Sequence, residues 1–253
     1  MLKTRVIPCL QLIGESLVKT VKFSNPGYIG DPVNTVRIFN ELEVDELCFL
    51  DIRASVENRK PSINILEQIA NEAFMPMAYG GGVRDFATAR EILSIGFEKI
   101  VINTEAVRAP SLITKISEYF GAQAVMASID VKKNFLGKYQ VYINDGTEKI
   151  AADPVEWAQE LQKYGAGEIL LTAIDREGTW GGYDVELTRK VTAAVSIPVI
   201  ANGGAGSIEH ITDVVKQGHA SAVALGSMVV YQKKGMGVLV NFPERALLNK
   251  YIG

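Results

Sequence analysis

Eight short apolar, β-rich segments alternate with longer amphipathic segments, and this alternation limits the folds that the chain can adopt. We expect strands at residues 5–10, 46–52, 75–79, 99–102, 124–129, 168–174, 198–201 and 222–225. We expect helices at residues 33–42, 63–70, 86–95, 111–119, 154–163, 185–194 and 208–217. Regular strand–helix alternation predicts an α/β fold with a parallel sheet. Eight units in 253 residues favour one (βα)8 barrel over an open, doubly wound sheet.

The chain also resembles itself at an offset of 122 residues. Residues 76–83 (PMAYGGGV) return as 198–205 (PVIANGGA), and residues 46–50 (ELCFL) return as 168–172 (EILLT). This repeat predicts two half-barrels, about 1–120 and 121–253. Because four strands alone cannot close a barrel, we expect a single domain over residues 1–253.

The composition excludes several classes of partner and site. The net charge is −3 and the basic residues are scattered, so neither nucleic acid nor an anionic membrane is expected as a partner. Cys9 and Cys48 lie in apolar runs and read as buried free thiols, which suits a reducing cytoplasm. No apolar run reaches the length of a membrane span, and the N-terminal run is too short for a signal sequence. With two His and two Cys far apart, no metal or cofactor is expected.

Two irregular segments stand out. Residues 14–32 form a long connection after the first strand, and such a connection on the carboxyl face of a barrel is a candidate lid. Residues 144–147 (NDGT) predict a hairpin turn in an excursion after the fifth strand.

Glycines and small polar residues end four of the predicted strands, two in each half. Closely approaching backbone N–H groups and helix N-termini favour phosphate, so the repeat predicts two phosphate sites and a ligand phosphorylated at both ends. The alternative is that these glycines only make tight turns. The residues assigned to phosphate are Gly81, Gly82, Asn103, Thr104, Gly178, Gly203, Gly204, Gly226 and Ser227.

Four motifs resemble the cyclase subunit of imidazole glycerol phosphate synthase over essentially the whole chain. They lie at residues 80–83 (GGGV), 101–104 (VINT), 174–179 (IDREGT) and 202–206 (NGGAG). The resemblance implies a barrel that takes ammonia from a glutaminase subunit, as a heterodimer, and uses it to split a bis-phosphorylated aminoimidazole carboxamide ribonucleotide. It implies a catalytic aspartate at Asp130, but Gln11 stands where the family's other catalytic aspartate is expected. Ring closure needs a proton acceptor and a proton donor, and an amide does not titrate usefully.

The resemblance carries further roles. It implies that Lys19 contacts substrate from the lid, that Thr172 and Asp175 line the catalytic mouth, and that Glu177 replaces the family's usual aspartate there. It implies a charged ring that gates ammonia entry at the base of the barrel, and it places Glu98 toward the glutaminase. The ring residues are Arg5, Glu46, Lys99 and Glu168.

An intact ammonia-receiving end combined with Gln11 is similar to a paralogous group of barrels found in bacterial surface-polysaccharide gene clusters. There the barrel and its glutaminase are thought to supply ammonia to a separate sugar amidotransferase, and residues 238–243 (VLVNFP) also resemble that group. We favour this interpretation. The alternatives are a working histidine-pathway cyclase and a non-catalytic scaffold that binds phosphoribosyl ligands.

Overall fold

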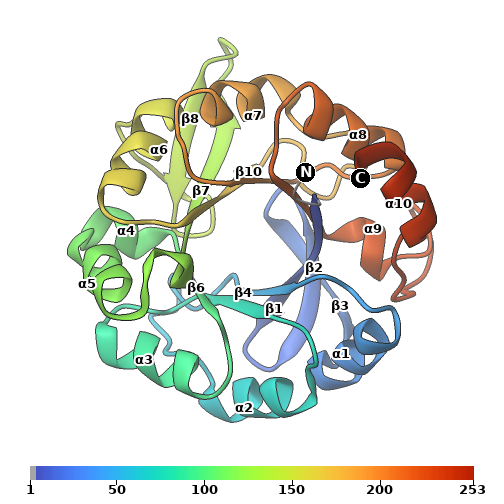
Figure 1. Cartoon of the computed structure of the whole chain (residues 1–253), viewed down its shortest axis with the longest axis horizontal. Helices are drawn as coiled ribbons and strands as arrows, with labels where there is room; N and C mark the ends of the chain where they lie inside the picture. Colours follow the sequence, from blue (N-terminus) through green and yellow to red (C-terminus); the bar gives the residue numbers. More distant parts are fainter. Residues whose placement is uncertain (1–3) are drawn as a thin grey trace.

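The computed structural model describes residues 4–253, and within them eight parallel strands close into a barrel (Figure 1). Neighbouring strands pair in sequence order, and the ring is closed by β12 against β1 and by β7 against β10. The (βα)8 prediction is therefore confirmed. The barrel strands are β1 (Arg5–Ile13), β4 (Leu47–Asp51), β5 (Met77–Gly80), β6 (Lys99–Ile102), β7 (Val125–Lys133), β10 (Glu168–Ala173), β11 (Val199–Asn202) and β12 (Ala222–Leu225).

Helices surround the barrel as an outer ring (Figure 1). The expected ones are α1 (Pro32–Glu41), α2 (Ile63–Glu72), α3 (Phe86–Ser94), α5 (Ser111–Phe120), α6 (Pro154–Lys163), α7 (Val185–Thr192) and α8 (Ile208–Lys216). The sequence patterns did not predict α4 (Thr104–Arg108), η1 (Ala122–Ala124), α9 (Ser227–Val230) or α10 (Arg245–Ile252). No helix within residues 4–253 is both long and apolar enough to cross a membrane.

Side-chain caps fix where several of these helices begin. Asp153 accepts hydrogen bonds from the backbone N–H groups of Val155 and Glu156, which have no partner within the helix. Pro154 follows as the first residue of α6, where a missing N–H costs nothing. Asp31 and Pro32 repeat this arrangement at the start of α1.

Small apolar side chains fill the inside of the barrel between its two ends. Cys9 and Cys48 lie opposite one another in neighbouring strands, and both are buried free thiols, as predicted. The interior cluster consists of Ile7, Cys9, Cys48, Ala78, Val101, Met126, Leu170, Ile200, Ala222 and Ala224. Apart from the two thiols, no member of the cluster carries a polar side-chain atom.

The connection at residues 14–32 is not irregular, as the sequence suggested, but folds into a β-hairpin. Its strands are β2 (Ser16–Val21) and β3 (Ser24–Gly30), and β2 pairs with the extended end of β1. The sequence pattern missed β2 because Lys19 and Thr20 are polar and yet buried, which breaks the expected apolar alternation.

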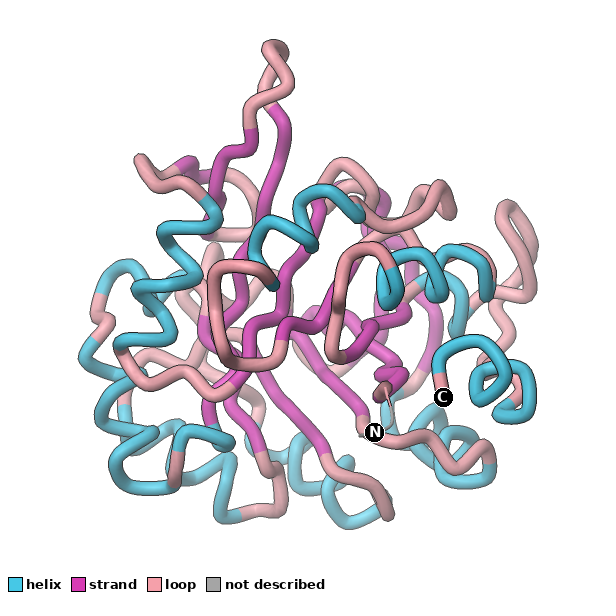
Figure 2. The backbone as a smooth tube through the Cα atoms, turned by 45° about the horizontal axis from the view of Figure 1, so that its top comes forward, coloured by secondary structure: helices cyan, strands magenta, loops and turns pink. Residues whose placement is uncertain are grey.

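A second hairpin follows β7. Strand β8 (Tyr139–Ile143) pairs with β7 and with the short β9 (Glu148–Lys149), and β7 and β8 project beyond the barrel (Figures 1 and 2). The predicted turn at residues 144–147 is confirmed by a backbone hydrogen bond of 3.2 Å from Thr147 N to Asn144 O. Asn144, Asp145 and Gly146 all have φ between 57° and 71°, which these residue types tolerate well.

Candidate active site at the barrel mouth

A cavity that is partly open to solvent lies at the carboxyl ends of the barrel strands. Every barrel strand contributes to its wall, either from its last residues or from the loop that follows it. The predicted site residues that line it are Gln11, Lys19, Gly81, Gly82, Asn103, Thr104, Asp130, Thr172, Glu177, Gly178, Gly203, Gly204, Gly226 and Ser227. The fold therefore brings together, at one cavity, predicted site residues that are far apart along the chain.

The two glycine pairs stand in equivalent surroundings. A Cβ on Gly81 would lie 2.4 Å from the backbone oxygen of Asp51, and a Cβ on Gly203 would lie 2.7 Å from that of Ala173. Both glycines have positive φ. Gly81 and Gly203 are 122 residues apart in the sequence, and so are their contacts Asp51 and Ala173. This match agrees with the half-barrel repeat, which stays a prediction. It also shows that close strand–loop packing alone requires glycine here, whatever ligand binds.

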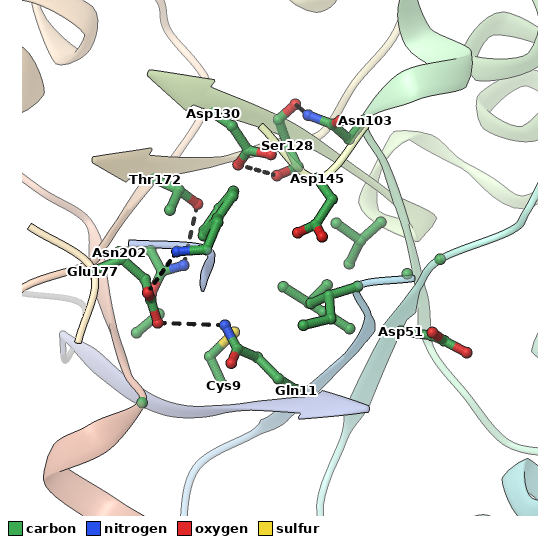
Figure 3. Close-up of a pocket in the computed structure, with 18 of the residues that line it drawn as sticks. Cys9, Gln11, Asp51, Asn103, Ser128, Asp130, Asp145, Thr172, Glu177 and Asn202 are labelled. Carbon is green, nitrogen blue, oxygen red and sulfur yellow. Dashed lines mark hydrogen bonds between the residues drawn. The ribbon is translucent and has the colours of Figure 1, made fainter. Parts of the chain in front are cut away.

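Asp130, on β7, is the buried carboxyl that the sequence singled out. Its side chain points into the cavity, and the Ser128 hydroxyl donates to it at 3.5 Å (Figure 3). Burial raises the pKa of Asp130 to about 7, although hydrogen bonds from Thr172 and Ser128 lower it, and the charge of Asp145 adds to the rise. A carboxyl that titrates near neutral pH can both give and take a proton.

Gln11 is buried and fully engaged in hydrogen bonds. Its Oε1 accepts from the Thr20 backbone N–H at 2.9 Å and from the Thr20 hydroxyl at 3.0 Å. Its Nε2 donates to the carboxylate of Glu177 at 3.4 Å (Figure 3). The side chain therefore holds the β2–β3 hairpin against the cavity wall.

Lys19 and Glu177 form a buried ion pair that fastens the same hairpin from the other side. Two further bonds reach the hairpin tip: Lys22 N–H donates to the Glu177 backbone oxygen at 3.0 Å, and Phe23 N–H donates to its carboxylate at 3.2 Å. Gly226 leaves room for the Lys19 alkyl chain, which would lie 2.9 Å from a Cβ at that position. The hairpin thus closes over part of the cavity, with Phe23 lining it.

Asp175 does not line the cavity, in contrast to the expectation from the resemblance. Its carboxylate accepts the backbone N–H of Lys133 at 2.7 Å, at the end of β7. The side chain therefore ties the loop after β10 to the β7–β8 hairpin. Its place beside Thr172 and Glu177 in the sequence gave no sign of this contact with β7.

Two further aspartates line the cavity, and neither was predicted from the sequence. Asp51 accepts from the guanidinium of Arg59 at 2.8 Å and from two backbone N–H groups of the loop after β4. Asp145 lies in the turn between β8 and β9, where the nearest cation is Arg53 at 3.8 Å. Burial raises the pKa of Asp145 to about 6, Arg53 lowers it, and Glu177 adds to the rise.

The four charged residues assigned to the gate meet at the opposite, amino end of the barrel. Arg5 contacts Glu46 and Glu168 at 2.6 Å each, and Lys99 contacts the same two carboxylates at 2.8 and 3.0 Å. The four side chains form a closed ring in which cations and anions alternate. Burial alone would lower the pKa of Arg5, but the two carboxylates raise it above its ordinary value.

Glu98, expected to face a glutaminase, is exposed at the same amino end of the barrel. Its carboxylate accepts the backbone N–H of Met77 at 2.6 Å, so it also holds the start of β5.

Comparison with known proteins places this geometry in a family. The family model described as histidine biosynthesis protein matches residues 5–235. A protein of Pseudomonas aeruginosa PAO1, provisionally named imidazole glycerol phosphate synthase subunit hisF2, is 47% identical over 244 residues, 96% of this chain and 97% of that protein. The imidazole glycerol phosphate synthase subunit HisF of Alkaliphilus metalliredigens is 42% identical over 233 residues, 92% of each chain. The chain therefore belongs to the histidine biosynthesis protein family.

Proposed function

We propose that this chain is the barrel subunit of a glutamine amidotransferase pair, and that its mouth binds a ligand phosphorylated at both ends. The observation that carries the proposal is the alignment of three features along one barrel. A closed charge ring lies at the amino end, small apolar side chains fill the interior, and a cavity with a titratable buried carboxyl lies at the carboxyl end.

The interior suits neutral ammonia better than a charged nitrogen source. Moving an unpaired charge into an apolar region is strongly unfavourable, whereas ammonia carries no net charge. Ammonia released by a glutaminase docked at the amino end, near Glu98, would pass the ring and the interior cluster before it meets Asp130. The names of the relatives, each a subunit of a synthase, support an assembly with a glutaminase partner.

Ammonia has two candidate destinations. The first is a separate sugar amidotransferase of surface-polysaccharide synthesis. Gln11 supports it, since an amide locked to Thr20 and Glu177 cannot carry protons for ring closure. The resemblance of residues 238–243 supports it as well.

The second destination is the cavity itself, with the chain acting as the cyclase that forms imidazole glycerol phosphate. The raised pKa of Asp130, about 7, supports this candidate, because a barrel that only passes ammonia onward has no need of a proton-transfer group.

One experiment tests the shared role. The chain is mixed with its candidate glutaminase, and glutamine hydrolysis is measured with and without the bis-phosphorylated aminoimidazole substrate. We expect the chain to stimulate hydrolysis, and the substrate to increase it further. A hydrolysis rate that is the same with and without the chain would contradict the proposed role.

A second experiment separates the two destinations by supplying ammonium chloride directly. For a cyclase, we expect turnover of the aminoimidazole substrate by the unmodified chain. For sugar amidation, we expect very little turnover, and little recovery in Gln11→Asp. If the cavity still fits the substrate and lacks only one carboxyl, Gln11→Asp should raise the rate by about 10²-fold or more.

A further inference from the structure

Four of the carboxylates that line the cavity divide into two that are held by close cations, Asp51 and Glu177, and two that are not, Asp130 and Asp145. Arg59 and two backbone N–H groups hold Asp51, while Lys19 and the Phe23 N–H hold Glu177. A carboxylate whose oxygens are already occupied by a cation and by N–H donors has little capacity left to exchange a proton with a ligand. Asp130 and Asp145 lack such close cations, and burial raises the pKa of each toward neutrality.

The fold fixes Asp145 relative to Asp130. Strand β8 pairs with β7 so that Tyr142 lies opposite Asp130, three residues before Asp145. The Asn144 N–H donates to the Thr104 hydroxyl at 3.2 Å, which ties the turn to the end of β6. Figure 3 shows both carboxylates pointing into the same cavity.

The tip of the β2–β3 hairpin also packs against the turn that carries Asp145. A Cβ on Gly146 would lie 3.0 Å from the ring of Phe23 and 3.3 Å from Ile174, so the turn already packs against both. Arg53, the nearest cation to Asp145, is 3.8 Å away, and its side chain is 40% exposed. It therefore helps to position the carboxylate without forming a close, buried ion pair with it.

We propose that Asp145 is the second proton-transfer carboxylate of this cavity and acts with Asp130 in the role that Gln11 cannot fill. The proposal rests on the second destination of the proposed function, in which ammonia reacts inside the barrel. Sequence reasoning assigned residues 144–147 to a turn alone, which explained Asp145 without a chemical role.

The step balances with one proton shared by the pair. The ammonia lone pair forms the new C–N bond at an electrophilic carbon, and the bond from that carbon to a leaving oxygen breaks with its electrons on the oxygen. The carboxylate of the pair takes the extra proton from nitrogen, and the carboxylic acid of the pair gives its proton to the leaving oxygen. The pair thus ends as it began, with one proton between two groups, and needs no other reactant.

The raised pKa values, about 7 for Asp130 and about 6 for Asp145, suit this arrangement near neutral pH. The charge of Asp145 adds to the rise in the pKa of Asp130, so the protonation of one carboxyl affects that of the other. The other charged side chains that line the cavity are Lys19, Asp51, Glu105 and Glu177, and Arg53 lies 3.8 Å from Asp145.

The test uses the full chain, ammonium chloride and the bis-phosphorylated aminoimidazole substrate, with kcat and KM measured from pH 5 to pH 9. We expect Asp145→Asn to lower kcat by about 10²-fold or more, with KM within about threefold. The bell-shaped pH profile should lose one limb. Asp145→Glu should recover part of the rate. Glu148→Gln, in the same hairpin but exposed and paired with Arg108, is the matched control and should behave as the unmodified chain.

The double variant distinguishes a chemical role shared by the two carboxyls from a purely structural role of Asp145. Groups that act as a unit lose activity non-additively, so Asp130→Asn with Asp145→Asn should cost little more than Asp130→Asn alone. Circular dichroism establishes that each variant folds.

Three outcomes decide between the proposals. Turnover of Asp145→Asn within about threefold of the unmodified chain overturns the role of Asp145 and leaves the cyclase standing. An unmodified chain that stimulates the glutaminase but does not turn over the substrate overturns the role of Asp145 and leaves ammonia supply standing. Neither stimulation nor turnover overturns the proposed function and this inference together.

Discussion

At the scale of single residues, Asp130 makes the stability of the whole chain depend on pH. An aspartate in an unfolded chain titrates near pH 4, whereas burial raises the pKa of Asp130 to about 7. Between these values the folded chain binds more protons than the unfolded chain. The contribution of this group to stability is therefore complete below pH 4 and is lost as the pH rises through 7.

Asp130→Asn should remove this dependence, because an amide stays neutral at every pH in this range. We expect the variant to exceed the unmodified chain in free energy of unfolding by up to about 4 kcal/mol at pH 8, since the pKa of Asp130 rises from about 4 to about 7 on folding and each pKa unit corresponds to about 1.4 kcal/mol. At pH 4 the two should be nearly equal. Urea unfolding at both pH values measures the difference, with Asp213→Asn on an exposed face of α8 as the control. A smaller gain at pH 8 than at pH 4 would contradict the explanation.

Motif-bearing residues could be predicted from the sequence, and residues that owe their place to tertiary contacts could not. Asp130 and the two glycine pairs lie at strand ends, where a parallel barrel brings all side chains to one mouth. No such rule predicts a chemical role for Asp145, because the hairpin turn alone explains the residue types at positions 144–146. Asp175 was expected at the mouth because it shares a motif with Glu177, but a shared motif does not determine the contacts of each side chain, and Asp175 binds the Lys133 N–H instead of lining the cavity.

At the scale of elements, the β2–β3 hairpin depends on a glycine from the other half of the barrel. Gly178, in the loop after β10, has φ 72°, and a Cβ there would lie 2.6 Å from the backbone oxygen of Thr20 and 2.9 Å from the Cα of Val21. The hairpin and this loop are thus packed backbone to backbone. The pattern of apolar residues in a sequence does not predict such a backbone contact. Residues 14–32 were therefore expected to form an irregular connection.

Gly178→Ala should lift the hairpin from the mouth. Gly137→Ala is a matched control, because Gly137 has φ 76° at the β7–β8 tip but nothing lies within 4 Å of its Cβ position. Both variants should lose about 1 kcal/mol of stability from the positive φ. Only Gly178→Ala should gain a rapid tryptic cut at Lys22. Equal cleavage in both variants would show that the glycine does not hold the hairpin.

At the scale of the whole molecule, the barrel separates a ring of charges at its amino end from a cavity at its carboxyl end. Eight parallel strands in sequence order leave all their amino ends on one side and all their carboxyl ends on the other, so the order of the strands alone predicts two distinct ends. The ring itself was expected only from the family resemblance, since its contacts from Arg5 to Glu168 and from Lys99 to Glu46 depend on barrel closure.

Glu46→Gln tests the ring by leaving Arg5 and Lys99 to share Glu168. Breaking a buried pair typically costs about 3–5 kcal/mol. Because Arg5 is partly exposed, we expect about 2 kcal/mol from urea unfolding. Glu186→Gln, which breaks an exposed pair with Lys190 on α7, should cost less than about 0.5 kcal/mol. In the glutaminase complex, Glu46→Gln should alter turnover driven by glutamine more than turnover driven by ammonium. Equal losses of stability in the two variants would contradict a stabilising role for the ring.

The closure of that ring has a consequence for how the subunit responds to ionic strength. At 1 M salt, screening acts over about 3 Å and removes most attractions between exposed charges, but partly buried pairs in direct contact are screened far less. The ring pairs lie 2.6–3.0 Å apart, and Glu46 and Glu168 are largely buried. A partner attracted through surface charges would therefore dissociate in concentrated salt while the ring stayed intact. Separation of the subunits and opening of the barrel end should accordingly respond to different solution conditions.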